Sequence, residues 1–201
     1  MSTQDNKLLT DNGGLRPAFG LALVTLLVMG LLYSLTGAGI GRMLFPQQAT
    51  GSIVERDGAA VGSALVAQPF GDVRYFQPRP SAANYDPMAA AGSNQARSNP
   101  DLRKRIEDTT AVVAARDGIA AVDVPAELVT QSGSGLDPDL SPAGARVQVA
   151  RVAAARRLPL DVVARLVAEH TLARQFGLLG EPRINVLELN LALDALGSGK
   201  P

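Results

Sequence analysis

Cysteine is absent from this chain of 201 residues, and histidine occurs once. The first absence excludes disulfides, cysteine-ligated zinc and thiol nucleophiles, and it gives no information on the redox compartment. The second excludes a metal site built from several histidines. We therefore expect no metal site in this protein.

The chain also lacks a charge excess and has few aromatic residues. Lys and Arg together number 19, as do Asp and Glu, and aromatic residues make up 4% of the sequence. Nucleic-acid binding needs basic side chains against the phosphates, and for single strands it needs aromatic rings that stack on bases. The composition therefore argues against a nucleic-acid partner.

One stretch of the sequence is long and apolar enough to cross a membrane. Residues 17–41 contain 25 residues without a charge, between Arg16 and Arg42. A helix of this length is roughly 37 Å long, against a hydrocarbon core of about 30 Å. The apolar region of a cleaved signal peptide, the main alternative, is usually about 7–15 residues. Because one span cannot enclose a pore, we expect an anchored module that works with other proteins.

Three glycines, Gly37, Gly39 and Gly41, lie at the end of this run. With Ala38 they are also consistent with the small residues of a cleavage site. Otherwise they mark either a loosened helix end or a surface where a second helix approaches closely.

Charge hardly distinguishes the two sides of the span. Lys7 and Arg16 precede it and Arg42 and Arg56 follow it, so the positive-inside comparison is close to a tie. A short tail before a first span usually stays in the cytoplasm. We expect a single-pass protein with its N-terminus in the cytoplasm and its larger part outside.

Four segments are expected: a short tail 1–16, a transmembrane helix 17–41, a connector 42–60 and a soluble domain 61–201. The last is long enough for one hydrophobic core. Short strands are expected at 61–67 and 73–76 around a turn at 68–72, followed by an ordered loop at 77–99. Helices are expected at 100–117, 125–131, 142–157, 160–176 and 185–196, although the last also alternates like a strand. The predicted fold class is a helix-rich α+β domain with a few short strands.

Three of these helices have clear start signals. Asn99-Pro100 and Ser141-Pro142 each combine a capping side chain with proline at the first helical position, and Asn185 is placed to cap the last helix.

The sequence QSGSGLD at 131–137, here called the glycine loop, joins two expected helices. Its glycines allow backbone N–H groups to turn toward an anion, and its serines add donors. The loop lacks the lysine and the preceding strand of a P-loop. A tight connector between helices is the simpler interpretation.

Other polar residues have similarly open interpretations. Arg146, Arg151, Arg156 and Arg157 on the helix 142–157 indicate either a solvated face or contact with an acidic partner. Gln148, among apolar neighbours on the same helix, indicates a side chain bonded to backbone. His170 is expected to be a satisfied helix residue rather than part of a hydrolase triad with Ser134 and Asp137, because the strand–turn–helix context of such a triad is missing.

The sequence YFQPRPSA at 75–82 combines aromatics, prolines and one arginine. Interfaces are enriched in such residues, so Tyr75, Phe76 and Arg79, together with Tyr85, are candidates for docking to a partner. An internal staple of the loop is the equal alternative.

Taken together, these segments resemble the KdpC family, the C subunit of the Kdp potassium-transporting P-type ATPase. The strongest match is LVTQSGSGLDP at 128–138. The other matches keep their order over nearly the whole domain: GSAL at 62–65 with Gln68, YFQPRPSA at 75–82 with Tyr85-Asp86, GSN at 92–94, Asn99-Pro100, Val124-Pro125, Ser141-Pro142, Gln148, RVA at 151–153, EHT at 169–171 and GEPRINVL at 180–187.

The resemblance implies an accessory subunit of the inner membrane, itself not catalytic, with its domain on the extracytoplasmic side. The implied partners are a channel-like potassium-translocating subunit, a P-type ATPase catalytic subunit, a small single-span subunit and membrane lipid. It also implies a role in assembly and in raising the ATP affinity of the catalytic subunit. The implied nucleotide-binding residues are Ser132, Gly133, Ser134, Gly135 and Gln148, so ATP is the one cofactor suggested.

Two positions depart from the family pattern. Asp139-Leu140 stands where relatives often have His-Ile, and Leu172 stands where an acid often follows His-Thr. A topological conflict also arises, because ATP is cytoplasmic and a domain outside the membrane cannot touch it. Any effect on ATP affinity would then pass through the partner subunits.

Overall fold

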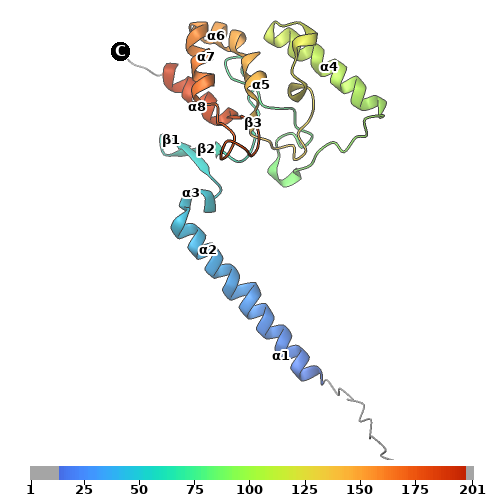
Figure 1. The fold of residues 1–201 in the computed structure, drawn as a ribbon, viewed down its shortest axis with the longest axis vertical. Coiled ribbons are helices and arrows are strands. Elements are labelled where there is room, and N and C mark those ends of the chain that lie inside the picture. Colours follow the sequence, from blue (N-terminus) through green and yellow to red (C-terminus); the bar gives the residue numbers. More distant parts are fainter. Residues whose placement is uncertain (1–13, 198–201) are drawn as a thin grey trace, which may run out of the picture. The chain divides into compact units, whose positions relative to one another are not determined.

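The computed structural model describes residues 14–197 (Figure 1). Residues 1–13 of the expected tail and residues 198–201 of the expected domain lie outside the described part. The chain divides after Gly51 into two compact units.

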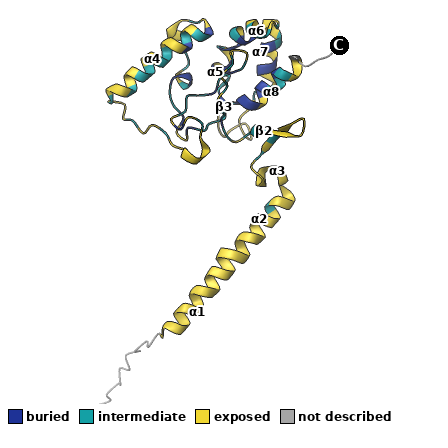
Figure 2. Ribbon diagram, turned by 180° about the vertical axis from the view of Figure 1, so that it is seen from behind, coloured by how far each residue is buried: buried dark blue, intermediate teal, exposed yellow. Residues whose placement is uncertain are grey.

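The first unit is dominated by one long helix, Leu15–Leu44. It consists of α1 (Leu15–Thr25), a π-helical stretch (Leu26–Leu32) and α2 (Tyr33–Leu44), and the short α3 (Pro46–Ala49) follows. Its most apolar window has a mean hydropathy of 2.2, and none of that window is buried (Figure 2). A helix that is apolar on all sides and unburied is typical of a membrane span.

The second unit starts with a β-hairpin. β1 (Ile53–Arg56) pairs antiparallel with β2 (Ala59–Ser63) across Asp57-Gly58, where both residues have positive φ. An Asp-Gly pair of this kind forms the two-residue turn that matches the twist of a hairpin. The strand expected at 61–67 is therefore shifted toward the N-terminus and pairs with residues inside the expected connector. The strand expected at 73–76 does not form.

Helices make up most of the second unit. They are α4 (Pro100–Asp117), α5 (Pro142–Arg146), α6 (Val149–Arg156), α7 (Leu160–Glu169) and α8 (Val186–Gly197), with short 3₁₀ turns at Pro87–Ala89, Ala121–Asp123 and Ala126–Leu128. The two-residue strands β3 (Asp139–Leu140) and β4 (Ile184–Asn185) pair antiparallel. In Figure 1, α5 to α8 gather on one side of this unit and α4 lies on the other. The helix-rich α+β class is confirmed.

Three predicted caps are confirmed by side-chain acceptors at the helix starts. The bonds are Asp101 N–H to Asn99 Oδ1 (2.8 Å), Gly144 N–H to Ser141 Oγ (3.1 Å) and Glu188 N–H to Asn185 Oδ1 (3.1 Å).

Three helix predictions need correction. The helix expected at 142–157 is interrupted at Val147-Gln148, between α5 and α6. The one expected at 125–131 is a single 3₁₀ turn. The one expected at 160–176 ends at Glu169, because the chain then turns into a hairpin in which Leu172 pairs with Arg183.

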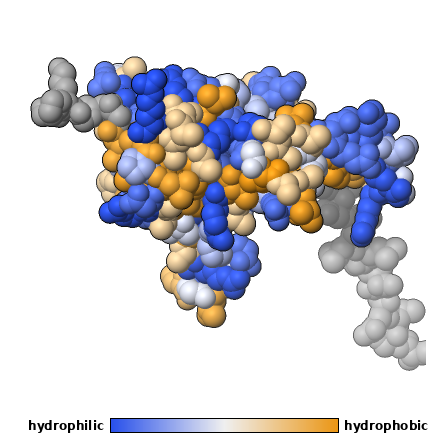
Figure 3. Space-filling view, turned by 90° about the horizontal axis from the view of Figure 1, so that it is seen from above, coloured by the Kyte–Doolittle hydropathy of each residue, from blue (hydrophilic) through white to orange (hydrophobic). Residues whose placement is uncertain are grey.

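The core lies among α5 to α8 and the segments that they cover. Val186, Leu189 and Leu193 lie on one face of α8 and are buried, which supports the helical interpretation of this segment over the strand alternative. The buried side chains around them include Phe76, Leu140, Val152, Val163 and Ile184. Hydrophilic and hydrophobic residues are interspersed on the face shown in Figure 3. The buried side chains named above give the second unit its own hydrophobic core, whereas the helix Leu15–Leu44 is exposed.

Candidate functional site

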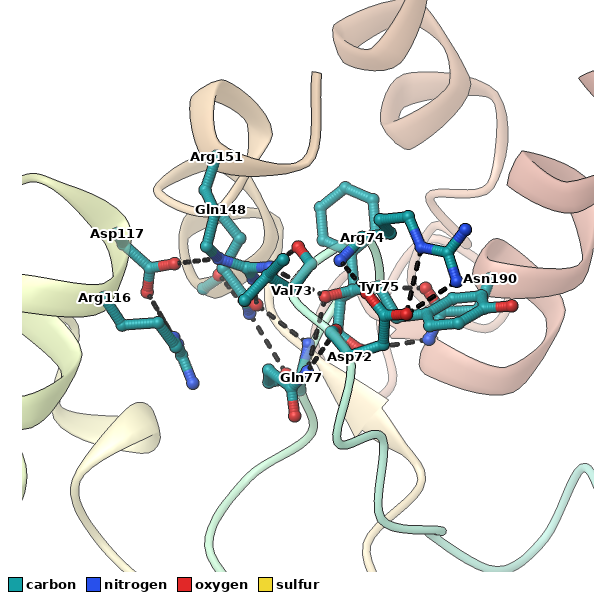
Figure 4. Close-up of polar contacts among 12 residues, drawn as sticks. Asp72, Val73, Arg74, Tyr75, Gln77, Arg116, Asp117, Gln148, Arg151 and Asn190 are labelled. Carbon is teal, nitrogen blue, oxygen red and sulfur yellow. Dashed lines mark hydrogen bonds and ion pairs between the residues drawn. The ribbon is translucent and has the colours of Figure 1, made fainter. Parts of the chain in front are cut away.

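Residues 73–77, here called the clamped segment, are held by side chains instead of by a neighbouring strand. α6, its N-cap Gln148 and α8 supply these side chains (Figure 4). Each of five successive backbone carbonyls accepts a hydrogen bond from them: Val73 and Tyr75 from Arg151, Arg74 from Arg156, Phe76 from Asn190, and Gln77 from Gln148. The segment therefore satisfies its carbonyls without joining a sheet, and the turn closed by the N–H of Tyr75 on the carbonyl of Asp72 (3.1 Å) takes the place of the expected strand.

Asn190 and Gln148 each bind one whole peptide edge. Asn190 Oδ1 accepts from the N–H of Phe76 (2.8 Å), and its Nδ2 donates to the carbonyl of the same residue (3.0 Å). Gln148 repeats this on Gln77, at 2.8 Å and 3.1 Å. Two buried amides thus copy the pairing of a strand edge, and they fix Phe76 in the core.

Gln148 has no hydrogen-bonding capacity left for a ligand in this arrangement. Its Oε1 also accepts from Arg151 (2.7 Å), its Nε2 also donates to the carbonyl of Gly144 (3.2 Å), and the side chain is fully buried. It lies between α5 and α6 and acts as their joint. The interpretation of a glutamine bonded to backbone is confirmed.

Arg151 joins the clamped segment to α4. Its Nε binds Asp117 Oδ1 at 2.6 Å, and Arg116 binds the other carboxylate oxygen at 2.6 Å. The Asp117 side chain is fully buried and that of Arg151 is 7% exposed. Burial lowers the pKa of Arg151, and the ion pair with Asp117 opposes this shift. The guanidinium stays in the interior because it has this partner.

A second ion cluster lies at the other end of the segment. Asp194 accepts from Arg156 (2.7 Å), Arg56 (2.8 Å) and the hydroxyl of Tyr75 (3.1 Å). Arg156 also lies over the ring of Tyr75, 4.7 Å from its centre. Burial raises the pKa of Asp194, but the hydrogen bonds from its three partners outweigh burial, and the net shift is downward.

The four candidate docking residues make internal contacts. Phe76 is fully buried, so it contributes to the core and not to a surface. Tyr75 and Tyr85 are partly buried, and the hydroxyl of Tyr85 donates to the carbonyl of Arg79 (2.9 Å). Burial raises the pKa of Tyr85. Arg79 pairs with Asp137 at 2.8 Å. These contacts favour the internal staple, and docking by this segment stays a prediction.

The glycine loop packs against residues 80–92. The N–H of Ser132 donates to the carbonyl of Pro80 (3.3 Å), and Ser81 Oγ donates to the carbonyl of Gly135 (2.6 Å). Gly135 has φ +72, and a Cβ there would lie 2.7 Å from the carbonyl oxygen of Ala91. Ser132 and Gly135 are buried, whereas Gly133 and Ser134 are exposed.

Within the described residues, no hydrogen bond joins Gln148 to Ser132, Gly133, Ser134 or Gly135. These five candidate nucleotide residues contact the 75–92 region at different points, and nucleotide binding by them stays a prediction. His170 Nδ1 lies 2.9 Å from the carbonyl oxygen of Leu166, and among residues 14–197 it makes no contact with Ser134 or Asp137. The satisfied histidine is confirmed. The described residues contain no cluster of metal-ligating side chains.

Asp139, one of the two departures from the family pattern, lies in an acidic neighbourhood. Its pKa is raised by burial and by the adjacent carboxylate of Asp137, while Arg183, 3.2 Å away, opposes the shift. The position is occupied by a partly buried charge that is paired inside the domain.

Sequence reasoning missed the members of this network that lie far apart in the chain. Asp117, Asn190 and Asp194 were not singled out, and Arg151 and Arg156 were read as surface residues. Asn190 did carry a signal, since it stands between Leu189 and Leu191 in an apolar helix. A polar residue in such a place is usually buried with a partner.

A sequence model of a protein family, described as "KdpC: K+-transporting ATPase, c chain", matches residues 15–195. The potassium-transporting ATPase KdpC subunit of Xanthomonas oryzae pv. oryzae (strain MAFF 311018) is 66% identical over 192 residues, which cover 96% of this chain and 92% of the relative. The KdpC subunit of Gemmatimonas aurantiaca is 51% identical over 190 residues (93% and 95%), and that of Methylococcus capsulatus is 50% identical over 184 residues (90% and 97%). The chain therefore belongs to the KdpC family, the c chains of K⁺-transporting ATPases.

Proposed function

We propose that this chain is a non-catalytic accessory subunit of an ATP-driven, high-affinity potassium uptake complex, and that the complex needs it for assembly. The observation that carries the proposal is the helix Leu15–Leu44, which is apolar, long enough to span a membrane and unburied. In contrast, the polar clusters described in the second unit are paired with each other. Such a helix offers a surface for lipid and partner helices, whereas the ion clusters around Asp117 and Asp194 stabilise the second unit itself.

Deletion of the chain tests this proposal most directly. We expect the remaining subunits to fail to purify as one complex on native gels, and cells without other uptake systems to stop growing at low potassium. The double variant Gly37→Leu and Gly41→Leu keeps the second unit and the membrane anchor but changes the helix surface. It therefore tests packing against a partner helix separately from anchoring, and Gly30→Leu is its control. Assembly and uptake that survive deletion would contradict the proposal.

The partners in this proposal are a channel-like potassium-translocating subunit, a P-type ATPase catalytic subunit and a small single-span subunit. Gly37 and Gly41 are four residues apart and therefore share a helix face, and a Cβ at either position would meet nothing within 4 Å inside this chain. Small residues at this spacing let a second helix approach closely. We expect the double leucine variant to weaken assembly more than Gly30→Leu.

We further propose that the N-terminus is cytoplasmic and that the second unit lies outside the inner membrane. Ser198, a natural position for a labelling cysteine, lies outside the described residues, so we choose Met88, which is 92% exposed. The chain has no native cysteine. An impermeant maleimide should label Met88→Cys in intact spheroplasts; labelling only after permeabilisation would reverse the orientation.

A second candidate is a regulatory subunit that raises the ATP affinity of the catalytic subunit by binding nucleotide itself. The exposed Gly133 and Ser134 are the favouring observation, because they leave part of the glycine loop open to an anion. If the second unit is extracytoplasmic, this direct contact is excluded and any ATP effect passes through the partners.

Photolabelling of the intact complex with a reactive ATP analogue distinguishes the two candidates. Gly133→Ala and Ser134→Ala are better variants than Gln148→Ala, because Gln148 holds the fold and a Cβ at Gly133 meets nothing within 4 Å. Labelling of this chain that falls in both variants supports direct binding. If the analogue labels the catalytic subunit alone, the second candidate fails.

A further inference from the structure

A cavity of about 460 Å³ opens where β1, the clamped segment, the end of α6 and α8 meet. Its volume lies within the range of about 300–1,000 Å³ that is usual for small-molecule sites. Four arginines line it, Arg56, Arg74, Arg156 and Arg157, with Asp194 as the one acid and Ala155 and Leu158 as apolar wall. We call it the arginine cavity.

The lining carries an excess of positive charge. Asp194 compensates one of the four guanidinium groups, and Asp72, which lies outside the lining, pairs with Arg74 at 2.6 Å. Arg56 also lies 4.0 Å from the carboxylate of Asp57, which leaves Arg157 as the lining arginine that has no carboxylate partner among the described residues. Like charges gathered around one hollow repel each other, and an anion placed between them removes that repulsion.

The guanidinium of Arg156 is fixed in place on several sides. Its Nη2 binds Asp194 (2.7 Å), its Nε donates to the carbonyl of Arg74 (2.8 Å), and Tyr75 lies against its face. Among the described residues, its Nη1 has no hydrogen-bond partner. This leaves a donor whose direction is set before any ligand arrives, which lowers the entropic cost of binding.

Arg157 contributes a charge that the fold does not use. It directly follows α6 in a left-handed conformation (φ +56), and its side chain is exposed. No ion pair or hydrogen bond of this side chain is formed within residues 14–197. It is therefore available to close over a ligand held by Arg56 and Arg156.

We propose that the arginine cavity binds a phosphate oxyanion. Guanidinium groups match phosphate oxygens in pairs and stay charged at any physiological pH, so the open Nη1 of Arg156 and the guanidinium of Arg157, side by side in the lining, favour this class of ligand. The proposal concerns a place separate from the glycine loop and does not depend on nucleotide binding there.

Two sources can supply this oxyanion, a free phosphate compound or the headgroup of an anionic phospholipid. Eleven residues lie between Leu44, the end of the membrane helix, and Arg56, and this length of chain spans at most roughly 40 Å. The chain itself therefore keeps Arg56 within reach of a membrane surface, so the test includes both sources.

The first arm uses the full-length chain in a neutral detergent and titrates it with inorganic pyrophosphate in a calorimeter at low salt. Arg157→Gln is the test variant and Arg146→Gln the matched control, because Arg146 is also an exposed arginine of the α5–α6 region but does not line this cavity. Both variants change the net charge equally. We expect Arg157→Gln to weaken binding about tenfold, the value of a charge-assisted contact, and Arg146→Gln to leave it unchanged.

The second arm uses the full-length chain in nanodiscs that contain phosphatidylcholine and phosphatidylglycerol. Native mass spectrometry then counts the lipids that stay bound to the chain after it is released from the nanodisc. Preferential retention of phosphatidylglycerol that is lost in Arg157→Gln but kept in Arg146→Gln supports the headgroup source. Pyrophosphate binding with the same variant pattern supports the free source.

The proposal is overturned if neither probe binds, or if the two variants lose binding equally. The latter result would show attraction to the net charge of the chain rather than to the cavity. Thermal unfolding of both variants checks the fold, and since neither side chain has a described partner, both should unfold at the wild-type temperature. The outcome is independent of whether deletion of the chain disrupts the pump.

Discussion

The clamped segment and the glycine loop are both irregular, and both were candidate sites, but they are held in opposite ways. Long side chains from α6 and α8 reach across to the backbone of residues 73–77. The glycine loop instead lies so close to Ala83 and Ala91 that a Cβ at Gly135 does not fit. The clamped segment depends on the side chains that hold it, and the glycine loop depends on the absence of a Cβ at Gly135. Removing a side chain should therefore disturb the first, and adding one should disturb the second.

The largest effect should come from breaking the ion pair between Arg151, which holds the clamped segment, and Asp117. Asp117→Ala leaves Arg151 buried without its carboxylate, and we expect a loss of about 3–5 kcal/mol in the free energy of unfolding. Asp108→Ala, in the exposed pair with Lys104 on the same helix, should cost less than about 0.5 kcal/mol. Urea unfolding of the full chain in detergent measures both. Equal losses would mean that burial of the pair does not matter.

Adding one methyl group should break the glycine loop almost as strongly. Gly135→Ala forces a left-handed conformation and a clash with the carbonyl of Ala91, for a combined loss of about 2–4 kcal/mol. Gly177→Ala is the matched control, since Gly177 has nearly the same φ but open space around it, and it should lose about 1 kcal/mol. The difference between the two variants measures the close approach alone. No difference would show that the loop is not tightly packed.

Removing one amide of the clamp should have a somewhat smaller effect. Gln148→Ala leaves the partly buried N–H and carbonyl of Gln77 without these partners, and we expect a loss of about 2–3 kcal/mol. Gln175→Ala, an exposed amide, should change the stability by less than about 0.5 kcal/mol. Amide hydrogen exchange at Gln77 provides a local readout, which should accelerate in the first variant only. Protection that persists at Gln77 would argue against the clamp.

The smallest effect concerns pH at the Asp194 end of the clamped segment. Because the folded-state pKa of Asp194 is lowered, its stabilising contribution is present above its unfolded pKa of about 3.9 and is lost as the pH falls through the folded value. The urea midpoint of wild type should therefore drop more steeply below about pH 4 than that of Asp194→Asn. Parallel profiles for the two proteins would contradict this assignment.

A feature could be predicted from the sequence when the residues that form it are neighbours in the chain. The caps at Asn99, Ser141 and Asn185 were predicted because a cap and its helix are neighbours in the chain. The split at Gln148 was missed because the periodicity of 142–157 continues through it. The hairpin at residues 53–63 was missed because its Asp57-Gly58 turn signal was read as part of a connector.

The candidate site shows the same division more sharply. The sequence predicts that Gln148 bonds to backbone. It does not identify the backbone group, because Gln77 lies 71 positions away in the chain. Asn190 lies 114 positions from Phe76. The strand expected at 73–76 does not form because the chain turns there: the N–H of Tyr75 donates to the carbonyl of Asp72 (3.1 Å).

By itself, the sequence determined the features that depend on neighbouring residues: the single apolar span, the helix-rich class, the helix caps and the family pattern. The tertiary structure decided which polar residues hold the fold and which remain available. Arg151, Arg156 and Arg157 look alike on a helix, yet the first two are spent on distant backbone and carboxylates, and the third is left at the arginine cavity. The physical reason is that the burial of a charge depends on a partner brought close by folding, and the local sequence does not contain that partner.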